Sequence, residues 1–405
     1  KDPYFRERQM PLLIGGATCS RVHTAVKIAP NYSGPVVYVP DASRSVSVAQ
    51  GLLSEQAASY IAELNADYAK VREQHANKKQ TPMWTLAQAR ANKMPIDWSQ
   101  GVPTAPKFIG RRVFKNYDLA EIAQYIDWGP FFQTWDLAGP FPAILDDEVV
   151  GEQARKVYAD GQAMLQKIID GRWVTANAVL GLYPANSVND DDIALYTDAS
   201  RQQVAMTWRG LRQQTEKHLI DGVMRSSRCL ADFVAPTGQD HVGVFAVTAG
   251  IGADKRAAAF EAAHDDYSAI MLKSLADRLA EALAECLHKK VRTDLWGYAA
   301  AEALSNEELI AEKYQGIRPA PGYPACPDHS AKKAMFDLLQ CQEIGMGLTE
   351  SLAMTPAASV SGFYIAHPEA QYFNVGKVGD DQVQDLAQRS GVEVKDLQRL
   401  LAPNL

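Results

Sequence analysis

The sequence predicts two unlike parts: the truncated end of a doubly wound α/β domain and a larger α+β domain. Three observations carry this prediction. The first ~78 residues follow a strand–helix–strand–helix order, a polar stretch occupies 76–82, and helices beyond it interleave with paired strands rather than with βαβ repeats. A length of 405 residues also exceeds what one hydrophobic core usually fills.

The first part, residues 1–78, contains two apolar runs that read as neighbouring parallel strands. Met10 to Ile14 ends at Gly15-Gly16 and is followed by a helix-like stretch over 21–28. A second run, Pro35 to Val39, precedes an amphipathic stretch that reaches about Gln74. Parallel neighbours need a crossover, and two strands alone do not make a stable open sheet. We therefore expect a clipped domain whose earlier strands are missing, in keeping with a chain that begins with Lys1.

The second part, residues 79–405, opens with a linker-like lead-in over 79–100. The clearest helix is predicted over 267–292, where Tyr267, Met271, Leu275, Leu279, Leu283 and Leu287 form an apolar stripe. The patterns predict further helices over 150–169, 197–219, 381–389 and 393–401. Strands are predicted over 242–247, 358–365 and 371–378, the last two as an antiparallel hairpin.

Composition and charge exclude several classes of protein. A net charge of −7 argues against a general nucleic-acid binder. No stretch approaches the ~20 apolar residues that span a bilayer, so no membrane segment is expected. Five scattered cysteines without a CxxC pair favour a reducing cytoplasm over a disulfide framework, and they provide no convincing metal site in this chain.

The segment RPAPGYPACPDH at 318–329 is the strongest candidate for a binding site. Four prolines stiffen it into what we expect to be one extended course. Arg318 could capture a ligand carboxylate in a bidentate manner, Tyr323 offers a ring for stacking, and His329 a donor or acceptor. The competing interpretation is a rigid surface loop with incidental polar residues.

Other residues are weaker candidates. Asp127 lies among aromatic residues in YIDWGPFFQTWDL, and a carboxylate there with Arg318 opposite would suit a zwitterionic amino acid. Gly15, Gly16 and Ala42 follow the two strands of the first part and either line a crevice or form tight turns. Two further sets of acids read as solvated: Asp277 with Glu281 on a helix face, and Asp190-Asp191-Asp192 in a loop.

Several motifs, in the right order, resemble cobalamin-dependent methionine synthases. GGATCSRVHTAVKI (15–28) and YVPDASR (38–44) are similar to the end of that family's flavodoxin-like cobalamin domain. The motifs that resemble its activation domain are YIDWGPFFQTWDL, QQTEKH, CLADFVAP, NEELI, RPAPGYPACPDH and SVSGFY.

The resemblance implies a C-shaped α+β activation domain, with a central antiparallel sheet, that binds S-adenosylmethionine. In that family's pattern Asp127 would hold the ligand's amino group, Arg318 its carboxylate, and the backbone of Pro319–Ala325 its adenosyl part. The pattern also implies ligand contacts at Tyr323, Ala325, Tyr372 and Phe373, a cobalamin pocket at Gly15, Gly16 and Ala42, and nearby positions Asp277, Glu281 and His329. Phe373 lacks the hydroxyl of the tyrosine that is common there.

The resemblance also implies an activity and partners. The intact enzyme moves a methyl group from methyltetrahydrofolate through cobalamin to homocysteine, and its activation domain supports the reductive remethylation of cob(II)alamin. Flavodoxin or a related flavoprotein reductase would donate the electron, and the linker near 76–82 would be the hinge between domain arrangements. We expect a cytoplasmic monomer that works with the remaining modules.

The chain departs from the family pattern where the earlier modules would stand. It lacks the DxHxxG motif whose histidine ligates cobalt, and neither the zinc-containing homocysteine module nor the folate module is represented. We therefore expect that this chain does not make methionine by itself. The alternative interpretation is a regulatory or docking module that binds S-adenosylmethionine without chemistry.

Overall fold

The computed structural model describes residues 3–15, 20–39, 45–76, 82–101, 103–220 and 223–405. The chain divides into two compact units, residues 1–82 and 83–405. Within the described residues, no helix is both long and apolar enough to cross a membrane.

The first unit contains the expected parallel strand pair. β1 (Leu12–Ile14) pairs with β2 (Val36–Tyr38), and α2 (Arg21–His23) with η1 (Thr24–Ile28) and η2 (Ala29–Asn31) makes the crossover. The predicted amphipathic stretch is two helices, α3 (Ser45–Leu53) and α4 (Ala57–Ala76), and a short α1 (Pro3–Glu7) precedes β1. Tyr68 of α4 is buried, and its hydroxyl accepts a hydrogen bond from Tyr38 N, which ties the helix to the strands.

A central antiparallel sheet organises the second unit, as predicted. Its described strands are ordered β12–β9–β4–β5–β6, and β3 pairs with the first half of β4. β4 is the longest strand, at 14 residues. The bounds are β3 (Gly110–Phe114), β4 (Thr175–Val188), β5 (Asp192–Tyr196), β6 (Val204–Arg209), β9 (Asp240–Ile251) and β12 (Ser359–Tyr364).

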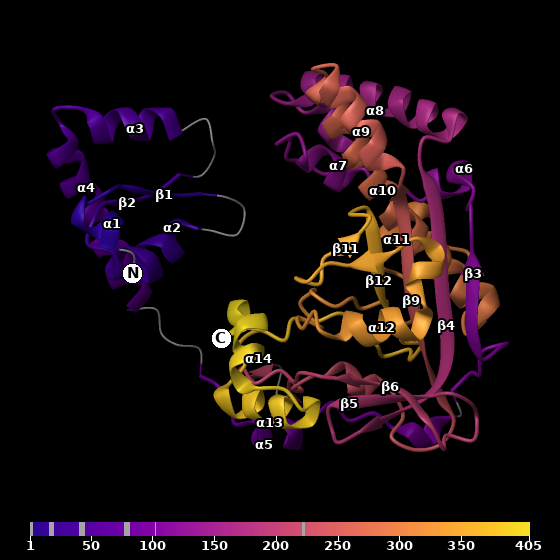
Figure 1. Ribbon diagram of the computed structural model, residues 1–405. Helices are drawn as coiled ribbons and strands as arrows, with labels where there is room; N and C mark the ends of the chain where they lie inside the picture. The colour runs from indigo at the N-terminus through magenta and orange to yellow at the C-terminus, as the bar shows by residue number, and fades with distance from the viewer. Residues whose placement is uncertain (1–2, 16–19, 40–44, 77–81, 102, 221–222) are drawn as a thin grey trace. The chain divides into compact units, whose positions relative to one another are not determined.

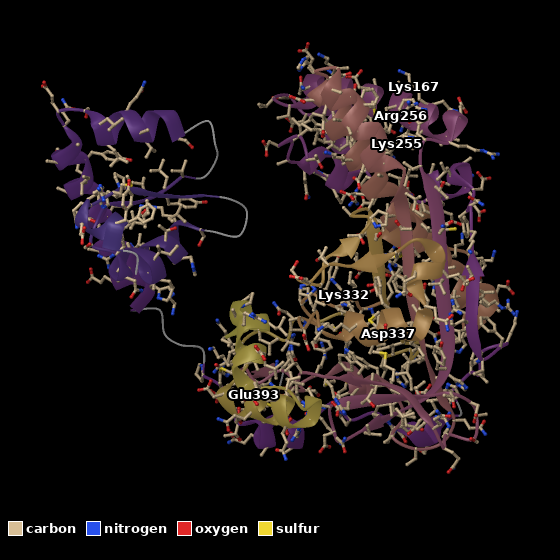
Figure 2. The ribbon with its side chains drawn as sticks, viewed as in Figure 1. Lys167, Lys255, Arg256, Lys332, Asp337 and Glu393 are labelled. Atoms are coloured by element: carbon tan, nitrogen blue, oxygen red, sulfur yellow. The ribbon has the colours of Figure 1, made fainter. Side chains whose placement is uncertain are left out.

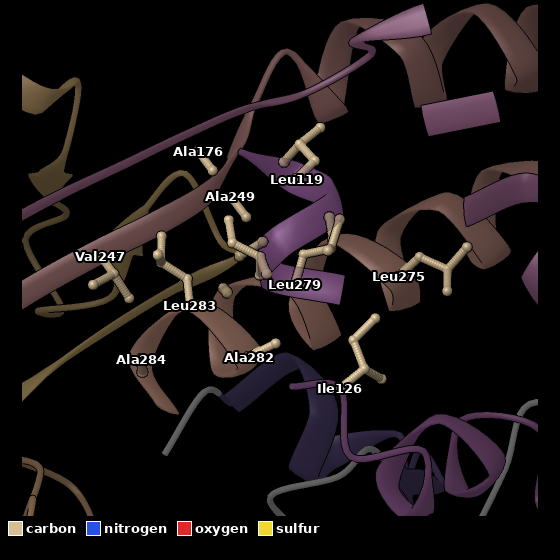
Figure 3. Packing of buried hydrophobic residues seen from close by; sticks show 14 of the residues in the cluster. Leu119, Ile126, Ala176, Val247, Ala249, Leu275, Leu279, Ala282, Leu283 and Ala284 are labelled. Carbon is tan, nitrogen blue, oxygen red and sulfur yellow. The ribbon is translucent and has the colours of Figure 1, made fainter. Parts of the chain in front are cut away.

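Both faces of this sheet are covered, because alternate residues of its long strands belong to different hydrophobic clusters. In β4, Leu180 packs in the cluster with α10 (Asp266–Lys290), whereas Val179 packs in the cluster with α12 (Ala331–Leu339). The predicted leucine stripe of α10 meets the sheet, as Figure 3 shows for Leu283 beside Val247. This packing places α10 across one face of β9 and β12.

Shorter elements complete the unit. Figure 1 shows α7 to α9 and α13 to α14 projecting from opposite ends of the long strands toward the same side, which gives this unit the expected C shape. The first of these ends carries Lys167, Lys255 and Arg256 (Figure 2), and Arg256 lies 3.9 Å above the ring of Trp173. The remaining helices are α5 (Leu86–Ala91), η4 (Trp98–Gln100), α6 (Leu119–Ala123), α7 (Gly129–Gln133), η5 (Ala143–Asp146), α8 (Gly151–Gly171), η6 (Leu230–Phe233), α9 (Ala253–Ala262), η7 (Val291–Leu295), α11 (Asn306–Ile310), η8 (Cys341–Ile344), α13 (Asp380–Ser390), α14 (Val394–Leu400) and η9 (Ala402–Asn404). The remaining strands are β7 (Leu219–Ile220), β8 (Val223–Met224), β10 (Gly347–Leu348) and β11 (Met354–Thr355).

Two predicted elements were wrong. The helix predicted over 197–219 is replaced by β6, in which Met206 and Trp208 alternate into the core with a period of two. The strand predicted over 371–378 is irregular, and the expected hairpin does not form because β12 pairs with β9 instead. The helices predicted over 150–169, 267–292, 381–389 and 393–401 are confirmed as α8, α10, α13 and α14.

The acidic run at 190–192 is not the solvated loop that was predicted. Asp191 and Asp192 are fully buried, and only Asp190 is exposed. Asp191 pairs with Arg212 and Arg90, each at 2.7 Å. The other ion pairs of this buried network join Asp192 to Arg209 and Arg389, and Arg212 to Asp232. Arg90 belongs to α5, which lies in the segment that was expected to be a linker-like lead-in. From residue 83 onward, this segment is therefore an integral part of the second unit.

Candidate ligand-binding site

A cleft of about 450 Å³ opens in the second unit where α10 faces the proline-rich segment. Its walls come from five places in the sequence: β9, α10, the residues after α11, the segment 318–325, and the stretch 360–374. The lining residues are Phe245, Glu281, Glu312, Arg318, Pro319, Ala320, Tyr323, Pro324, Ala325, Val360, Tyr372, Phe373 and Asn374. Five of the residues singled out from the sequence therefore meet here with Glu281: Arg318, Tyr323, Ala325, Tyr372 and Phe373.

The proline-rich segment is held in place by backbone hydrogen bonds. Ile317 pairs with Ile365 beyond the end of β12, and Phe363 N donates to Pro319 O at 2.9 Å. After Pro319 the chain turns twice, so the expectation of one extended course is wrong beyond that residue. Proline lacks an N–H, so the prolines of the segment contribute only carbonyls, and Pro324 O accepts a hydrogen bond from Val375 N at 2.9 Å.

Gly362 of β12 permits this close approach. A Cβ at this position would lie 2.6 Å from Pro319 O and 2.9 Å from the ring of Phe245. Gly362→Ala should therefore displace the proline-rich segment and lower the free energy of unfolding by roughly 1 to 3 kcal/mol. All seven tryptophans lie in the second unit, so the urea midpoint of tryptophan fluorescence measures the change.

A matched control for this substitution is Gly347→Ala, whose Cβ would meet only the Thr355 hydroxyl, at 3.2 Å. That variant should unfold close to the wild-type midpoint. Equal midpoints for Gly362→Ala and the wild type would show that the segment does not depend on the glycine.

Arg318 is anchored on one side only. Its Nη1 lies 2.7 Å from Glu285 Oε2 and donates hydrogen bonds to Tyr314 Oη at 3.0 Å and His288 Nδ1 at 3.3 Å. Within the described residues, neither Nε nor Nη2 has a hydrogen bond or ion pair, and the side chain keeps 20% of its exposure. The Nε–Nη2 edge, which matches a carboxylate in a bidentate manner, is thus open to the cleft.

Buried charges behind Arg318 neutralise one another. Arg292 is fully buried and binds Glu302 through two hydrogen bonds, at 2.7 and 2.8 Å, and its Nη1 lies 3.7 Å from Glu285 Oε1. Burial opposes the charge on Arg318, but the combined attraction of Glu285, the two tyrosines Tyr314 and Tyr372, and Glu281 outweighs it, so the pKa of Arg318 is raised. The two arginines with Glu285 and Glu302 together carry no net charge, and Arg318 stays a cation at the wall of the cleft.

Two tyrosines complete the support of Arg318. Tyr372 Oη accepts a hydrogen bond from Arg318 N at 3.0 Å and lies 3.2 Å from Tyr314 Oη. Either hydroxyl can be the donor in this pair, because each oxygen can accept two hydrogen bonds and donate one. Tyr372 itself lines the cleft.

Acidic side chains stand beside the arginine. Glu281 and Glu312 both line the cleft. Burial raises the pKa of Glu312, while attraction by Arg318 works in the opposite direction. Attraction of the proton by the nearby Glu281 carboxylate is the largest cause that raises the pKa of Tyr323, a residue that is 56% exposed. The cleft therefore combines one open guanidinium edge with two carboxylates and an accessible aromatic ring.

Three of the other expected residues do not line the cleft. Asp127 is half-buried and its Oδ1 accepts a hydrogen bond from Gly129 N at 2.9 Å, so its role toward a ligand stays a prediction. Asp277 is exposed on α10 one turn before Glu281. The ring of His329 packs against Gly322, where a Cβ would lie 2.1 Å from Cε1, and therefore buttresses the turn of the proline-rich segment.

The predicted cobalamin contacts belong to the first unit. Gly16 and Ala42 lie outside the described residues. Gly15 follows β1, and a Cβ there would lie 2.8 Å from Val39 O beyond β2. The two backbones approach so closely here that a side chain would clash, and this packing explains the glycine at position 15.

The sequence reasoning missed four residues in the surroundings of Arg318. Glu285 and His288 lie on α10, and Glu312 and Tyr314 follow α11. One signal was available for the helix: polar residues at 281, 285 and 288 recur at helical spacing among apolar residues. No comparable local pattern marks Glu312 or Tyr314.

This geometry defines a small-molecule-binding domain of the α+β class, with an arginine edge at one wall and a proline-rich segment along another. Residues 118–391 match the family described as the activation domain of vitamin B12 dependent methionine synthase. The chain is also similar to a solved structure titled "Crystal Structure of the MetH Reactivation Domain bound to AdoHcy", with 50% sequence identity and a TM-score of 0.76. That match covers 80% of this chain and 99% of the other. The chain therefore belongs to the family of vitamin B12-dependent methionine synthase activation domains.

Proposed function

We propose that the cleft binds S-adenosylmethionine and presents its methyl group for the reductive remethylation of cob(II)alamin. The observation that carries this proposal is the open Nε–Nη2 edge of Arg318 at the start of the proline-rich segment. The related reactivation domain was solved with S-adenosylhomocysteine, the product that remains after the methyl group has left. The reaction takes one electron from a flavodoxin or a related flavoprotein reductase and transfers the sulfonium methyl group to cobalt.

The chain's own residues would act by positioning the ligand. The carboxylate of the ligand would bind the Nε–Nη2 edge of Arg318, and its adenosyl part would lie along Pro319–Ala325 with Tyr323 as a stacking surface. Tyr372, which lines the cleft, would contact the ligand, and Asp127 would hold the amino group. Contacts at several points would fix the position of the methyl group. Orienting a reacting group in this way is itself a contribution to catalysis.

The cobalamin side of the reaction belongs to the first unit and to other modules. Gly15 stands at the carboxyl end of a parallel strand, which is the position where ligands approach such sheets, and this fits a cobalamin tail. Bound cobalamin would supply the cobalt that accepts the methyl group. We propose a cytoplasmic monomer that works with the remaining methionine synthase modules and makes no methionine by itself.

A reconstitution experiment tests the function. The chain is mixed with a cobalamin-loaded complementary fragment, a one-electron donor and S-adenosylmethionine labelled in its methyl group. Transfer of the label to cobalamin is the expected result. Tight binding of S-adenosylmethionine without label transfer would instead favour the alternative, a regulatory module that binds the ligand without chemistry.

The two acids of the cleft should favour the cationic ligand over its neutral product. S-Adenosylmethionine carries a sulfonium charge that S-adenosylhomocysteine lacks. In Glu312→Gln, the preference for S-adenosylmethionine should fall about three- to tenfold, or roughly 0.7 to 1.4 kcal/mol. Calorimetric titration with both ligands measures the ratio, and Glu307→Gln, an exposed acid on the neighbouring α11, is the control.

The same preference should depend on pH. Burial raises the pKa of Glu312, so its carboxylate is ionised and attracts the sulfonium above that pKa and is neutral below it. The preference should therefore decline as the pH falls through a range above that of an ordinary glutamate. An unchanged ratio in Glu312→Gln at neutral pH would show that this carboxylate does not sense the sulfonium.

A further inference from the structure

His288 occupies a fixed place behind the cleft. It is fully buried on α10, and its ring stacks on Tyr364 with a centroid distance of 5.1 Å and an interplanar angle of 13°. Tyr364 stacks in turn on Phe245 at 4.6 Å and 13°, and Phe245 lines the cleft. A column of three rings, from three different elements, thus joins the wall of the cleft to the residues that hold Arg318.

The hydrogen bonds of His288 define its protonation. Burial, with repulsion by Arg292 and Arg318, lowers the pKa of His288 well below its usual value, so the ring is neutral. A guanidinium only donates, so Nδ1, 3.3 Å from Arg318 Nη1, must be the acceptor. Nε2 then bears the proton, which it donates to Tyr298 Oη at 3.4 Å.

This arrangement decides which edge of Arg318 faces the ligand. The hydrogen bonds of Nη1 run to Tyr314 and His288, while Glu285 supplies the opposing charge. Rotation of the guanidinium would break both hydrogen bonds, so the Nε–Nη2 edge stays at the cleft. Because His288 is neutral, it orients the arginine without adding a second negative charge that would repel a ligand carboxylate.

We propose that His288 is a positioning residue that makes the cleft selective for ligands with a free carboxylate. It acts through Arg318 and touches no ligand itself. The inference rests on the proposed function, because it assumes that the carboxylate of S-adenosylmethionine binds Arg318. It adds a residue to that function. Recognition of the amino-acid end of the ligand depends on His288, whereas recognition of the adenosyl end does not.

A comparison of two ligands tests the proposal. S-Adenosylhomocysteine carries the carboxylate, whereas 5′-methylthioadenosine has the same adenosine and thioether without the amino-acid end. Calorimetry of His288→Leu should show at least a tenfold loss of affinity for S-adenosylhomocysteine and less than a twofold change for 5′-methylthioadenosine. In His288→Asn, the amide oxygen replaces Nδ1 as acceptor, so affinity for S-adenosylhomocysteine should stay within about threefold of the wild type.

Equal losses for both ligands, or no loss for either, would overturn the positioning role while leaving the proposed function intact. Failure of the wild-type chain to bind S-adenosylhomocysteine would instead overturn the proposed function itself. Should His288→Leu not fold, Tyr298→Phe decides the question, since it removes only the hydroxyl that accepts from Nε2 and helps to hold the ring in place. It should weaken S-adenosylhomocysteine about threefold and leave 5′-methylthioadenosine unchanged, and wild-type affinity for both would contradict the proposal.

Discussion

Arg318→Ala should lower the affinity for S-adenosylmethionine at least about 100-fold, the largest effect on binding that we expect from one substitution. The change removes the open Nε–Nη2 edge, and it leaves the buried Glu285 behind the cleft without its partner at 2.7 Å. The Glu285 carboxylate would keep only its longer ion pair with Arg292, at 3.7 Å, and would repel the carboxylate of the ligand, so the loss exceeds that of two hydrogen bonds. Isothermal titration with S-adenosylmethionine measures the effect.

Arg318→Lys is the matched control. Lysine keeps the positive charge beside Glu285 but offers a point charge in place of the planar edge. Affinity should fall less than in the alanine variant, and the tryptophan fluorescence of both variants should report a folded second unit. Affinity in Arg318→Ala within twofold of the wild type would show that the carboxylate binds elsewhere.

Arg212→Leu should cause the largest loss of stability, roughly 3 to 5 kcal/mol. Arg212 is fully buried and pairs with Asp191 at 2.7 Å and Asp232 at 2.8 Å, and its Nη1 also donates to Ser227 O. Leucine would leave two buried carboxylates with fewer cations around them. Urea unfolding followed by tryptophan fluorescence measures the loss in the second unit.

Arg399→Ala provides the comparison for that substitution. Arg399 is 81% exposed and lies 3.8 Å from Asp396, and such pairs contribute about 0.5 kcal/mol or less. Its unfolding midpoint should match the wild type. If Arg212→Leu behaved like Arg399→Ala, the buried ion-pair network would not stabilise the fold.

Some elements were predictable because their signal is local. The leucine stripe of α10 repeats every four residues, and the apolar runs of the first unit alternate with helical stretches, so both appeared in the sequence. β4 was missed, although it is the longest strand, because it is buried on both faces and shows no polar alternation. It also contains Gly181 and Pro184, which argue against a central strand.

The candidate site was predictable only in part, for a related reason. Arg318, Tyr323 and Ala325 share one short motif whose composition is unusual. Two partners of Arg318, Glu285 and His288, come by contrast from α10, about 30 residues earlier in the chain, and only the packing of that helix on the sheet brings them to the arginine. The buried aspartates 191 and 192 looked solvated because Arg90 and Arg389 are distant in the sequence.

A crystal structure of the chain soaked with S-adenosylmethionine tests the central claim most directly. The account predicts the carboxylate of the ligand on Nε and Nη2 of Arg318, and its adenosyl part along Pro319–Ala325 beside Tyr323. Density for the ligand at another place, or a carboxylate bound away from Arg318, would contradict it.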